Sequence, residues 1–220
     1  MYTITIGDKA YSSWSMRGWL LLAGFGIRFE EELVPMYDPA FDAMKVEHAP
    51  ARTVPQLSFR ESGRRLRVWD TIAIAETLAE RHPAAGIWPH DRIQRTIARC
   101  LVAEMHSGFP VLRGVAPMNI HREGRPLVER PEGLEHDLDR LGTLWTWAVQ
   151  ETGGPWLGGE AFSAADAFFA PVASRLHSYA LMDERTQPYA ERLLAHPAVI
   201  RWFEEARATP RRIAHYEEIP

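Results

Sequence analysis

Two adjacent hydroxyl residues, Ser12 and Ser13, lie on a loop that leads into the first helical pattern of the chain. A hydroxyl can donate a hydrogen bond to a nearby anion, and the N-terminus of a helix adds a favourable field. Serines are also common N-caps, which satisfy helix N–H groups without any ligand. From residue type and spacing alone, anion stabilisation and simple capping are equally good interpretations.

Two other pairs could build a binding site. Val54-Pro55 could form a cis peptide bond, which would expose the backbone of Val54 to an added extended peptide. The alternative is an ordinary trans proline at a strand edge. Asp70-Thr71 opens a helical pattern with a carboxylate and a hydroxyl, which suit an ammonium and a carboxylate group. Asp70 can also act as a helix cap.

The first part of the chain must bring these groups together. Apolar alternation and turn residues predict strands over 2–6, 29–34, 53–59 and 65–69. Helical patterns cover 15–23 and 70–81, and a proline-containing crossover with a short helix is expected over 35–51. This order predicts a small mixed sheet with helices packed on it.

The remainder of the chain has a different pattern. Prolines and a glycine between His82 and Asp91 predict an interdomain linker, and beyond it apolar residues recur at helical spacing. We therefore expect an α/β domain over 1–82, a linker over 83–91 and an all-helical bundle domain over 92–220.

Composition narrows the function classes. The 220 residues carry 25 basic and 29 acidic side chains, a formal charge of -4, which argues against a nucleic-acid partner. No apolar run approaches about 18 residues, so no membrane span is expected. The N-terminus does not read as a signal peptide, and one cysteine in the chain fits a reducing cytoplasm.

Four segments, in this order, make the sequence similar to the glutathione transferase superfamily, whose fold is a thioredoxin-like domain followed by a helical domain. The Ser-Ser motif most resembles serine-type bacterial and zeta-like members. The four segments are 11–17 (YSSWSMR), 53–57 (TVPQL), 70–76 (DTIAIAE) and 156–166 (WLGGEAFSAAD).

The resemblance implies a reaction that starts from the thiol of glutathione. The thiol pKa is near 8.5, and lowering it by about 2 units needs about 2.7 kcal/mol of preferential stabilisation of the thiolate. Ser12 aligns with the catalytic serine of the family, and Ser13 is the second choice.

The resemblance also implies a glutathione site. Val54 and Pro55 would pair with the cysteinyl part, in the cis form, and Asp70 with Thr71 would bind the γ-glutamyl end. Many relatives have Glu or Gln followed by Ser there, so contact distances can differ. A glycine-lysine pair of many relatives is replaced here by Arg52-Thr53, so Arg52 or His48 is the candidate for the glycyl carboxylate.

For the second, mostly apolar electrophile, a pocket is expected at Trp14, Met105, Phe109 and Met118, although interhelical packing is an equally good interpretation of Met105. The resemblance implies a cytoplasmic homodimer active in detoxification.

Two other functions remain open. One is a glutathione-dependent cis–trans isomerase of the maleylacetoacetate type, with Arg113, Arg122 and Arg125 as candidates to bind a dianionic substrate. Trp14 replaces the cysteine of the zeta-like motif, which argues against this function. The other is a non-catalytic binding protein with the same fold, which would need none of the chemistry of Ser12, Pro55 and Asp70-Thr71.

Several conspicuous residues are assigned structural roles. Cys100 is expected to be a buried, inert thiol on the apolar helix face of Ile93 and Ile97. The nine histidines lack metal-ligand spacing, so no metal is expected. Ser163 and Asp166 read as a capping box.

Overall fold

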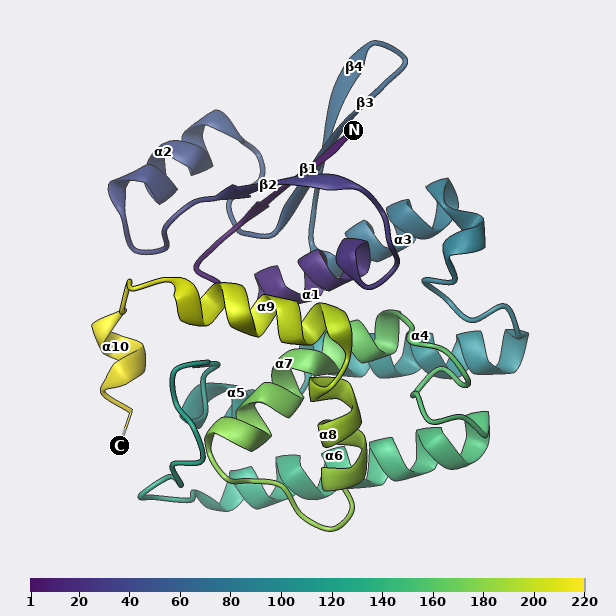
Figure 1. Cartoon of the computed structure of the whole chain (residues 1–220), viewed down its shortest axis with the longest axis vertical. Helices are drawn as coiled ribbons and strands as arrows, with labels where there is room; N and C mark the ends of the chain where they lie inside the picture. Colours follow the sequence, from purple (N-terminus) through teal and green to yellow (C-terminus); the bar gives the residue numbers. More distant parts are fainter. Residues whose placement is uncertain (220) are drawn as a thin grey trace.

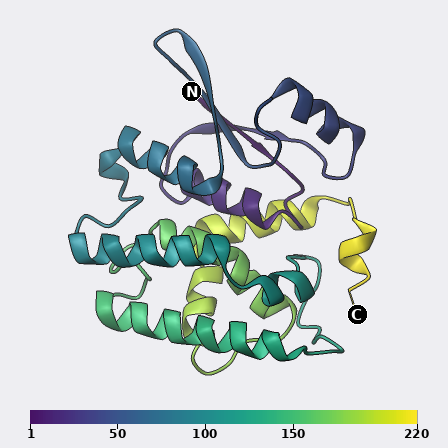
Figure 2. The same cartoon turned by 180° about the vertical axis from the view of Figure 1, so that it is seen from behind.

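The computed structural model describes residues 1–219 and shows two parts stacked on each other (Figures 1 and 2). The first part is a four-stranded sheet with helices. Its elements are β1 (Tyr2–Ile6), α1 (Ser13–Ala23), β2 (Phe29–Leu33), α2 (Pro39–Glu47), β3 (Gln56–Glu61), β4 (Arg64–Trp69) and α3 (Thr71–Arg81).

The sheet has the strand order β2-β1-β3-β4. β1 and β2 are parallel, with Ile4 opposite Glu31, while β3 runs antiparallel to both β1 and β4. This is the arrangement of a thioredoxin-like domain, so the predicted fold class is confirmed. β3 begins at Gln56, three residues later than predicted, because residues 53 to 55 form the loop that carries Pro55.

The second part is entirely helical, as predicted. A single 3-10 turn, η1 (Pro83–Ala85), precedes it. Its helices are α4 (Arg92–Ser107), α5 (Pro110–Val115), α6 (Glu132–Thr152), α7 (Ala164–Ser178), α8 (Gln187–Leu194), α9 (Pro197–Ala208) and α10 (Ala214–Glu217). Within residues 1–219, no helix is long and apolar enough to cross a membrane.

Helix α1 joins the two parts. It packs on β1 and α3 on one side and on α7 and α9 on the other, as the two views show (Figures 1 and 2). Its central residues, Ser15 to Leu22, are buried on every side of the helix. A helix that is buried on every face must lie between two packed layers. The position of the α1 N-terminus is therefore fixed by both parts of the protein.

Helix α7 begins with the predicted capping box. Asp166, which is fully buried, accepts hydrogen bonds from the Ser163 backbone N–H at 2.8 Å and the Ser163 hydroxyl at 2.8 Å. Its other carboxylate oxygen accepts from the Leu157 N–H at 3.0 Å and the Tyr189 hydroxyl at 2.7 Å. One carboxylate thus joins the start of α7, the preceding loop and α8, which confirms its structural role.

The prediction for Cys100 is wrong, because its side chain is exposed. The buried stripe of α4 runs through Ile97, Ala98, Leu101, Val102 and Met105. At about 100° per residue, Cys100 and Ile93 lie more than roughly 100° from the centre of that stripe. Ile93, predicted to lie on the apolar face, is 68% exposed and does not lie on it.

We predict that Asp166→Ala lowers the free energy of unfolding by about 3 kcal/mol or more, because it leaves several buried donors without an acceptor. Asp139→Ala is the matched control, since that carboxylate is 71% exposed and pairs with Arg185 on the surface; a change under about 1 kcal/mol is expected there. Urea unfolding of both variants measures the difference. Equal losses would contradict the role given to Asp166.

Candidate functional site

The predicted serines lie at the N-terminus of α1, at the junction of the two parts. Ser12 is the N-cap, and its Oγ accepts a hydrogen bond from the Ser15 backbone N–H at 3.3 Å. The Ser12 hydroxyl donates to Ser15 Oγ at 2.7 Å, and Ser15 Oγ also accepts from the Gly7 N–H at 2.9 Å. Ser12 therefore both caps the helix and lines a cavity, so the two interpretations of the sequence are compatible.

Ser13 is held by a different partner. Its Oγ accepts a hydrogen bond from Arg175 Nη2 at 3.2 Å, across the junction between α1 and α7. The guanidinium donates and the hydroxyl oxygen accepts, so the Ser13 proton remains available for another acceptor. Arg175 was not among the residues chosen from the sequence. The available signal was a single arginine within the largely apolar stretch of α7.

The Val54–Pro55 peptide bond is cis, as predicted. Pro55 packs directly against α1, since a Cβ atom added to Gly18 would lie 2.5 Å from Pro55 Cγ. Only glycine allows this approach between the helix and the proline loop. A small cleft of about 200 Å³ lies beside it, lined by Trp14, Thr53, Val54, Pro55, Asp70 and Thr71.

Asp70 and Thr71 supply the polar end of this cleft. Asp70 has a φ of 76°, an unusual value for a residue with a side chain, and its Oδ1 accepts from the Ile72 N–H at 2.8 Å. Strained backbone of this kind often marks a binding site. The Thr71 hydroxyl is buried and has no hydrogen-bond partner among the described residues. The cleft thus offers a carboxylate and an unused hydroxyl close together.

A second cavity, of about 470 Å³, is lined by both serines. Two of the four residues predicted for the second-substrate pocket, Trp14 and Met118, line it. Met105 and Phe109 instead lie in the hydrophobic core, where the Phe109 ring is 6.4 Å from that of Phe169. The remaining lining residues are Tyr11, Ser12, Ser13, Met36, Ser107, Gly108, Pro110, Arg113, Gly114, Pro117, Arg175 and Tyr216.

Trp14 separates the two cavities, since it lines both. Its indole is flanked by the guanidinium groups of Arg17 and Arg113, at 4.5 and 5.0 Å from the ring. The His106 ring contacts Trp14 edge-on at 5.0 Å, and its Nε2 lies 3.3 Å from Asp70 Oδ2. The Trp14 side chain is therefore held in place by residues from both parts of the protein.

Positive charge is concentrated around the serines. Burial, followed by the charges of Arg175 and Arg113, holds the pKa of Arg17 well below its ordinary value. Burial and Arg113 lower the pKa of Arg175 to about 10, so Arg175 remains protonated at neutral pH. Burial alone lowers the pKa of Arg113. These directions are those expected for cations held in an apolar environment beside one another.

Tyr11 lines the second cavity, but its hydroxyl already donates a hydrogen bond within the protein. Its hydroxyl donates to the Glu217 carboxylate, and burial together with this hydrogen bond raises the Tyr11 pKa. Since a tyrosine that stays neutral and donates elsewhere contributes little to an anion, the serines are the better candidates.

The two residues expected near the glycyl carboxylate are placed differently. His48 is buried, with Nδ1 2.9 Å from Gln56 Oε1 and 2.7 Å from Arg67 Nη1. Arg52 is exposed, beside Thr53 at the edge of the smaller cleft. Of the two, Arg52 has the freer side chain to reach a ligand there.

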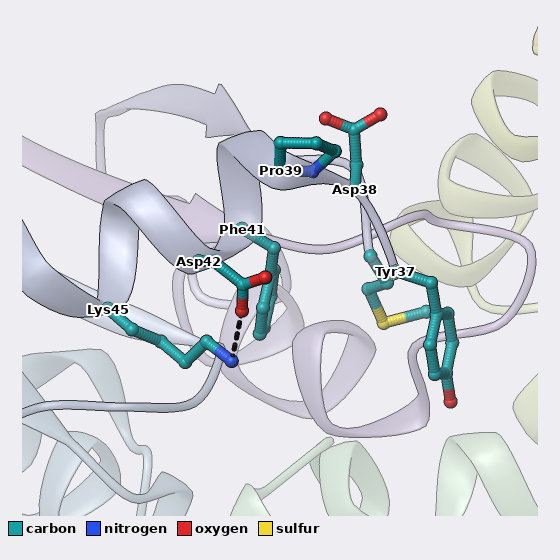
Figure 3. A pocket seen from close by; sticks show the side chains of 7 residues that line it. Tyr37, Asp38, Pro39, Phe41, Asp42 and Lys45 are labelled. Carbon is teal, nitrogen blue, oxygen red and sulfur yellow. Dashed lines mark ion pairs between the residues drawn. The ribbon is translucent and has the colours of Figure 1, made fainter.

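A third hollow, of about 540 Å³, lies at the start of α2 (Figure 3). It is lined by Met36, Tyr37, Asp38, Pro39, Phe41, Asp42 and Lys45. Figure 3 shows Lys45 turned toward Asp42, and their ion pair measures 2.6 Å. Because it contains neither the serines nor the cis-proline loop, we do not place the chemistry there. Residues 1–219 also contain no group of three or more His, Cys, Asp or Glu side chains placed to hold a metal ion.

Comparison with protein families agrees with this geometry. The family model described as "Glutathione S-transferase, N-terminal domain" matches residues 11–81, and that described as "Glutathione S-transferase, C-terminal domain" matches residues 127–205. Together the two matches cover most of the chain, in the order that the fold requires. The chain belongs to the glutathione S-transferase family.

Solved structures show the same fold. A glutathione transferase homologue from Burkholderia (BGR1), with bound glutathione, is 24% identical with a TM-score of 0.68, over 94% of this chain and 98% of that one. A glutathione transferase from Methylococcus capsulatus is 23% identical with a TM-score of 0.65, over 95% and 100%. FzlA from C. crescentus is 18% identical with a TM-score of 0.69, over 99% and 98%. No protein of curated function matches the chain in sequence.

We predict that Gly18→Ala displaces Pro55 and lowers the free energy of unfolding by about 1 to 3 kcal/mol, because its Cβ would overlap the proline ring. In an ordinary helix interior the same change stabilises the helix by about 1 kcal/mol. Gly142→Ala in α6 is the control, since its added Cβ meets the flexible end of Arg185 at 3.0 Å. Urea unfolding of both variants is the measurement, and a Gly18 variant as stable as wild type would contradict the contact's role.

Proposed function

We propose that this protein is a serine-type glutathione transferase, which activates the thiol of glutathione for attack on an electrophilic second substrate. The observation that carries the proposal is that Ser12 and Ser13 line the larger cavity beside Trp14, which also lines the cis-proline cleft. One cavity has the groups that a γ-glutamyl peptide needs, and the other is open to a second molecule. The Burkholderia homologue with bound glutathione supports the same ligand here.

Glutathione fits the smaller cleft by its chemistry. Val54, which lines the cleft beside Pro55, can pair through its backbone with the cysteinyl residue as an added strand would. The Asp70 carboxylate suits the γ-glutamyl ammonium, and the partnerless Thr71 hydroxyl suits its carboxylate. Arg52 is the proposed partner of the glycyl carboxylate. The sulfur would then lie at the N-terminus of α1.

Either serine can stabilise the thiolate. Hydroxyl hydrogens rotate, so Ser15 can donate to Ser12 Oγ while Ser12 turns its own proton to the sulfur. Ser13 has its proton available, because Arg175 donates to its oxygen. We assign Ser12 as the principal donor, since it caps α1 and receives support from Ser15, and Ser13 as the second. The adjacent helix N-terminus and the cationic side chains favour the same anion.

Three properties of the family are carried over as proposals. We propose a cytoplasmic homodimer with a role in detoxification. The exposed apolar side chains of Trp69, on β4, and Ile93, on α4, are candidates for a subunit contact. The exposed, unpaired thiol of Cys100 is compatible with a reducing compartment.

We predict that Ser12→Ala lowers kcat/KM for a chlorinated nitroaromatic acceptor by about 10-fold to 1000-fold, the range expected when a principal anion donor is removed. Ser13→Ala should lower kcat/KM by a smaller factor. Ser15→Ala should lower kcat while leaving the KM for glutathione nearly unchanged. Steady-state kinetics of the three variants against wild type provide the measurement. A larger loss in Ser13→Ala than in Ser12→Ala would reverse the assignment of the two serines.

Retention on immobilised glutathione, combined with an activity assay, distinguishes a transferase from a non-catalytic binding protein. A transferase is retained and turns over the acceptor. Retention without turnover of any acceptor would support the non-catalytic binding protein, and failure to bind glutathione would refute the proposal.

The pH dependence of the rate tests the electrostatic part of the proposal. The free thiol titrates near pH 8.5, and the enzyme-bound thiol should titrate about 2 units lower because the anion is preferentially stabilised. In wild type, kcat should therefore rise with pH through about 6.5 and then level off. In Ser12→Ala the rise should move toward pH 8.5, and an unchanged profile would contradict the role of this hydroxyl.

A further inference from the structure

We propose that the larger cavity binds a second substrate that carries a carboxylate, held by Arg175 and Arg113 beside the reacting sulfur. The inference rests on the proposed function and names the class of acceptor for the same site. It follows from an accumulation of cationic groups that the thiolate chemistry alone does not require.

Arg175 is the central group. It is 4% exposed, yet it lines the cavity. Its Nη1 donates to the Pro171 carbonyl at 3.0 Å and its Nη2 to Ser13 Oγ at 3.2 Å. Its Nε is buried and has no hydrogen-bond partner among residues 1–219. A buried guanidinium normally pairs with a carboxylate, which accepts two parallel hydrogen bonds from it.

Arg113 adds a second positive charge to the wall of the same cavity. It lies over the Trp14 ring, and its Nη1 is 3.3 Å from the His106 carbonyl and 3.4 Å from that of Gly108. Neutral carbonyl partners at these distances leave its charge uncompensated. Arg113 is one of the three arginines that the sequence offered for an anionic substrate; the other two, Arg122 and Arg125, do not line the cavity.

Arg17 is the third cation near these two arginines, and it contacts the Trp14 ring. It is fully buried between the rings of Trp14 and Phe168, and its Nε and Nη1 have no partner in the described part of the chain. None of the three arginines forms an ion pair with a carboxylate of residues 1–219, whereas the buried Lys9 pairs with both Glu31 and Glu205. Burying like charges together is costly, and a bound anion removes much of that cost.

The carboxylates of glutathione have other partners. In the proposed function, the γ-glutamyl carboxylate is assigned to Thr71 in the smaller cleft and the glycyl carboxylate to Arg52, next to Thr53 of that cleft. Trp14 stands between that cleft and the arginine-lined wall. The anion that reaches Arg175 and Arg113 therefore belongs to the second molecule.

The rest of the cavity fits a flat, unsaturated framework. The rings of Tyr11 and Tyr216 are stacked at 4.9 Å, and Met36 and Met118 provide adaptable apolar surface. An acceptor with its ring against these groups and its carboxylate at the arginines would present an electrophilic carbon to the sulfur. With a chloronitroarene, the thiolate forms the carbon–sulfur bond and chloride leaves with the electron pair of the broken bond.

A matched pair of acceptors tests the proposal. The probes are 4-chloro-3-nitrobenzoate and 4-chloro-3-nitrobenzamide, which have the same shape and leaving group but differ in charge. Each kcat/KM is divided by the uncatalysed rate of that acceptor with glutathione. For wild type we expect the acid to be preferred over the amide by about 10-fold to 100-fold, the range of charge-assisted hydrogen bonds.

Variants assign the preference to the arginines. Arg175→Met and Arg113→Met should each reduce the preference for the acid over the amide at least about fivefold. Arg175→Lys should retain part of this preference. Arg192→Met, on the exposed surface of α8, is the control and should leave the preference unchanged. If Arg175→Met fails to fold, Arg113→Met and Arg175→Lys still provide the test.

Three outcomes are distinguishable. Turnover of the amide with no preference for the acid would overturn this inference and leave the transferase intact. Turnover of neither acceptor would refute the proposed function. A raised KM for glutathione with an unchanged acceptor preference would mean that the arginines bind a carboxylate of the tripeptide, which would also overturn the inference.

Discussion

The burial of α1 on all sides is the constraint on which the rest of the structure depends. One face of the helix packs on β1 and α3, and the opposite face packs on α7 and α9. The helix can therefore not shift without disturbing both parts of the protein. Its N-terminus, with Ser12 and Ser13, stays at the junction, where a peptide bound to the first part can meet a molecule bound to the second. Gly18 extends the same constraint, because it sets how closely the helix approaches Pro55.

The electrostatics of the junction follow from that packing. Arg17 from α1 and Arg113 from α5 flank Trp14, and Arg175 from α7 donates a hydrogen bond to the adjacent Ser13. Unpaired buried charges reduce stability, so their presence points to anions that are bound during function. A thiolate and a carboxylate would both be favoured in such a field, and the fold stabilises them with groups held in place before either arrives.

Much of the fold could be predicted because each local pattern agrees with the tertiary structure. The alternation of Tyr2, Ile4 and Ile6, the apolar α1 and the Ser163–Asp166 capping box all formed as expected. Cys100 shows where the reasoning failed. A helical pattern gives the positions that share a face but not the orientation of that face, and in α4 packing against α6 and α7 selected the stripe through Leu101 and Met105 instead.

The sequence by itself determined the order of the elements, the cis-proline loop, the Asp70-Thr71 helix start and the serines at the mouth of α1, because each depends on residues within a few positions of one another. Only the tertiary structure decided what surrounds them. It brought Arg175, more than 160 residues away in the chain, to Ser13, placed Met105 and Phe109 in the core and brought Tyr216 to the cavity. Such contacts arise from how helices pack across the junction, and helix packing is not encoded in the spacing of neighbouring residues.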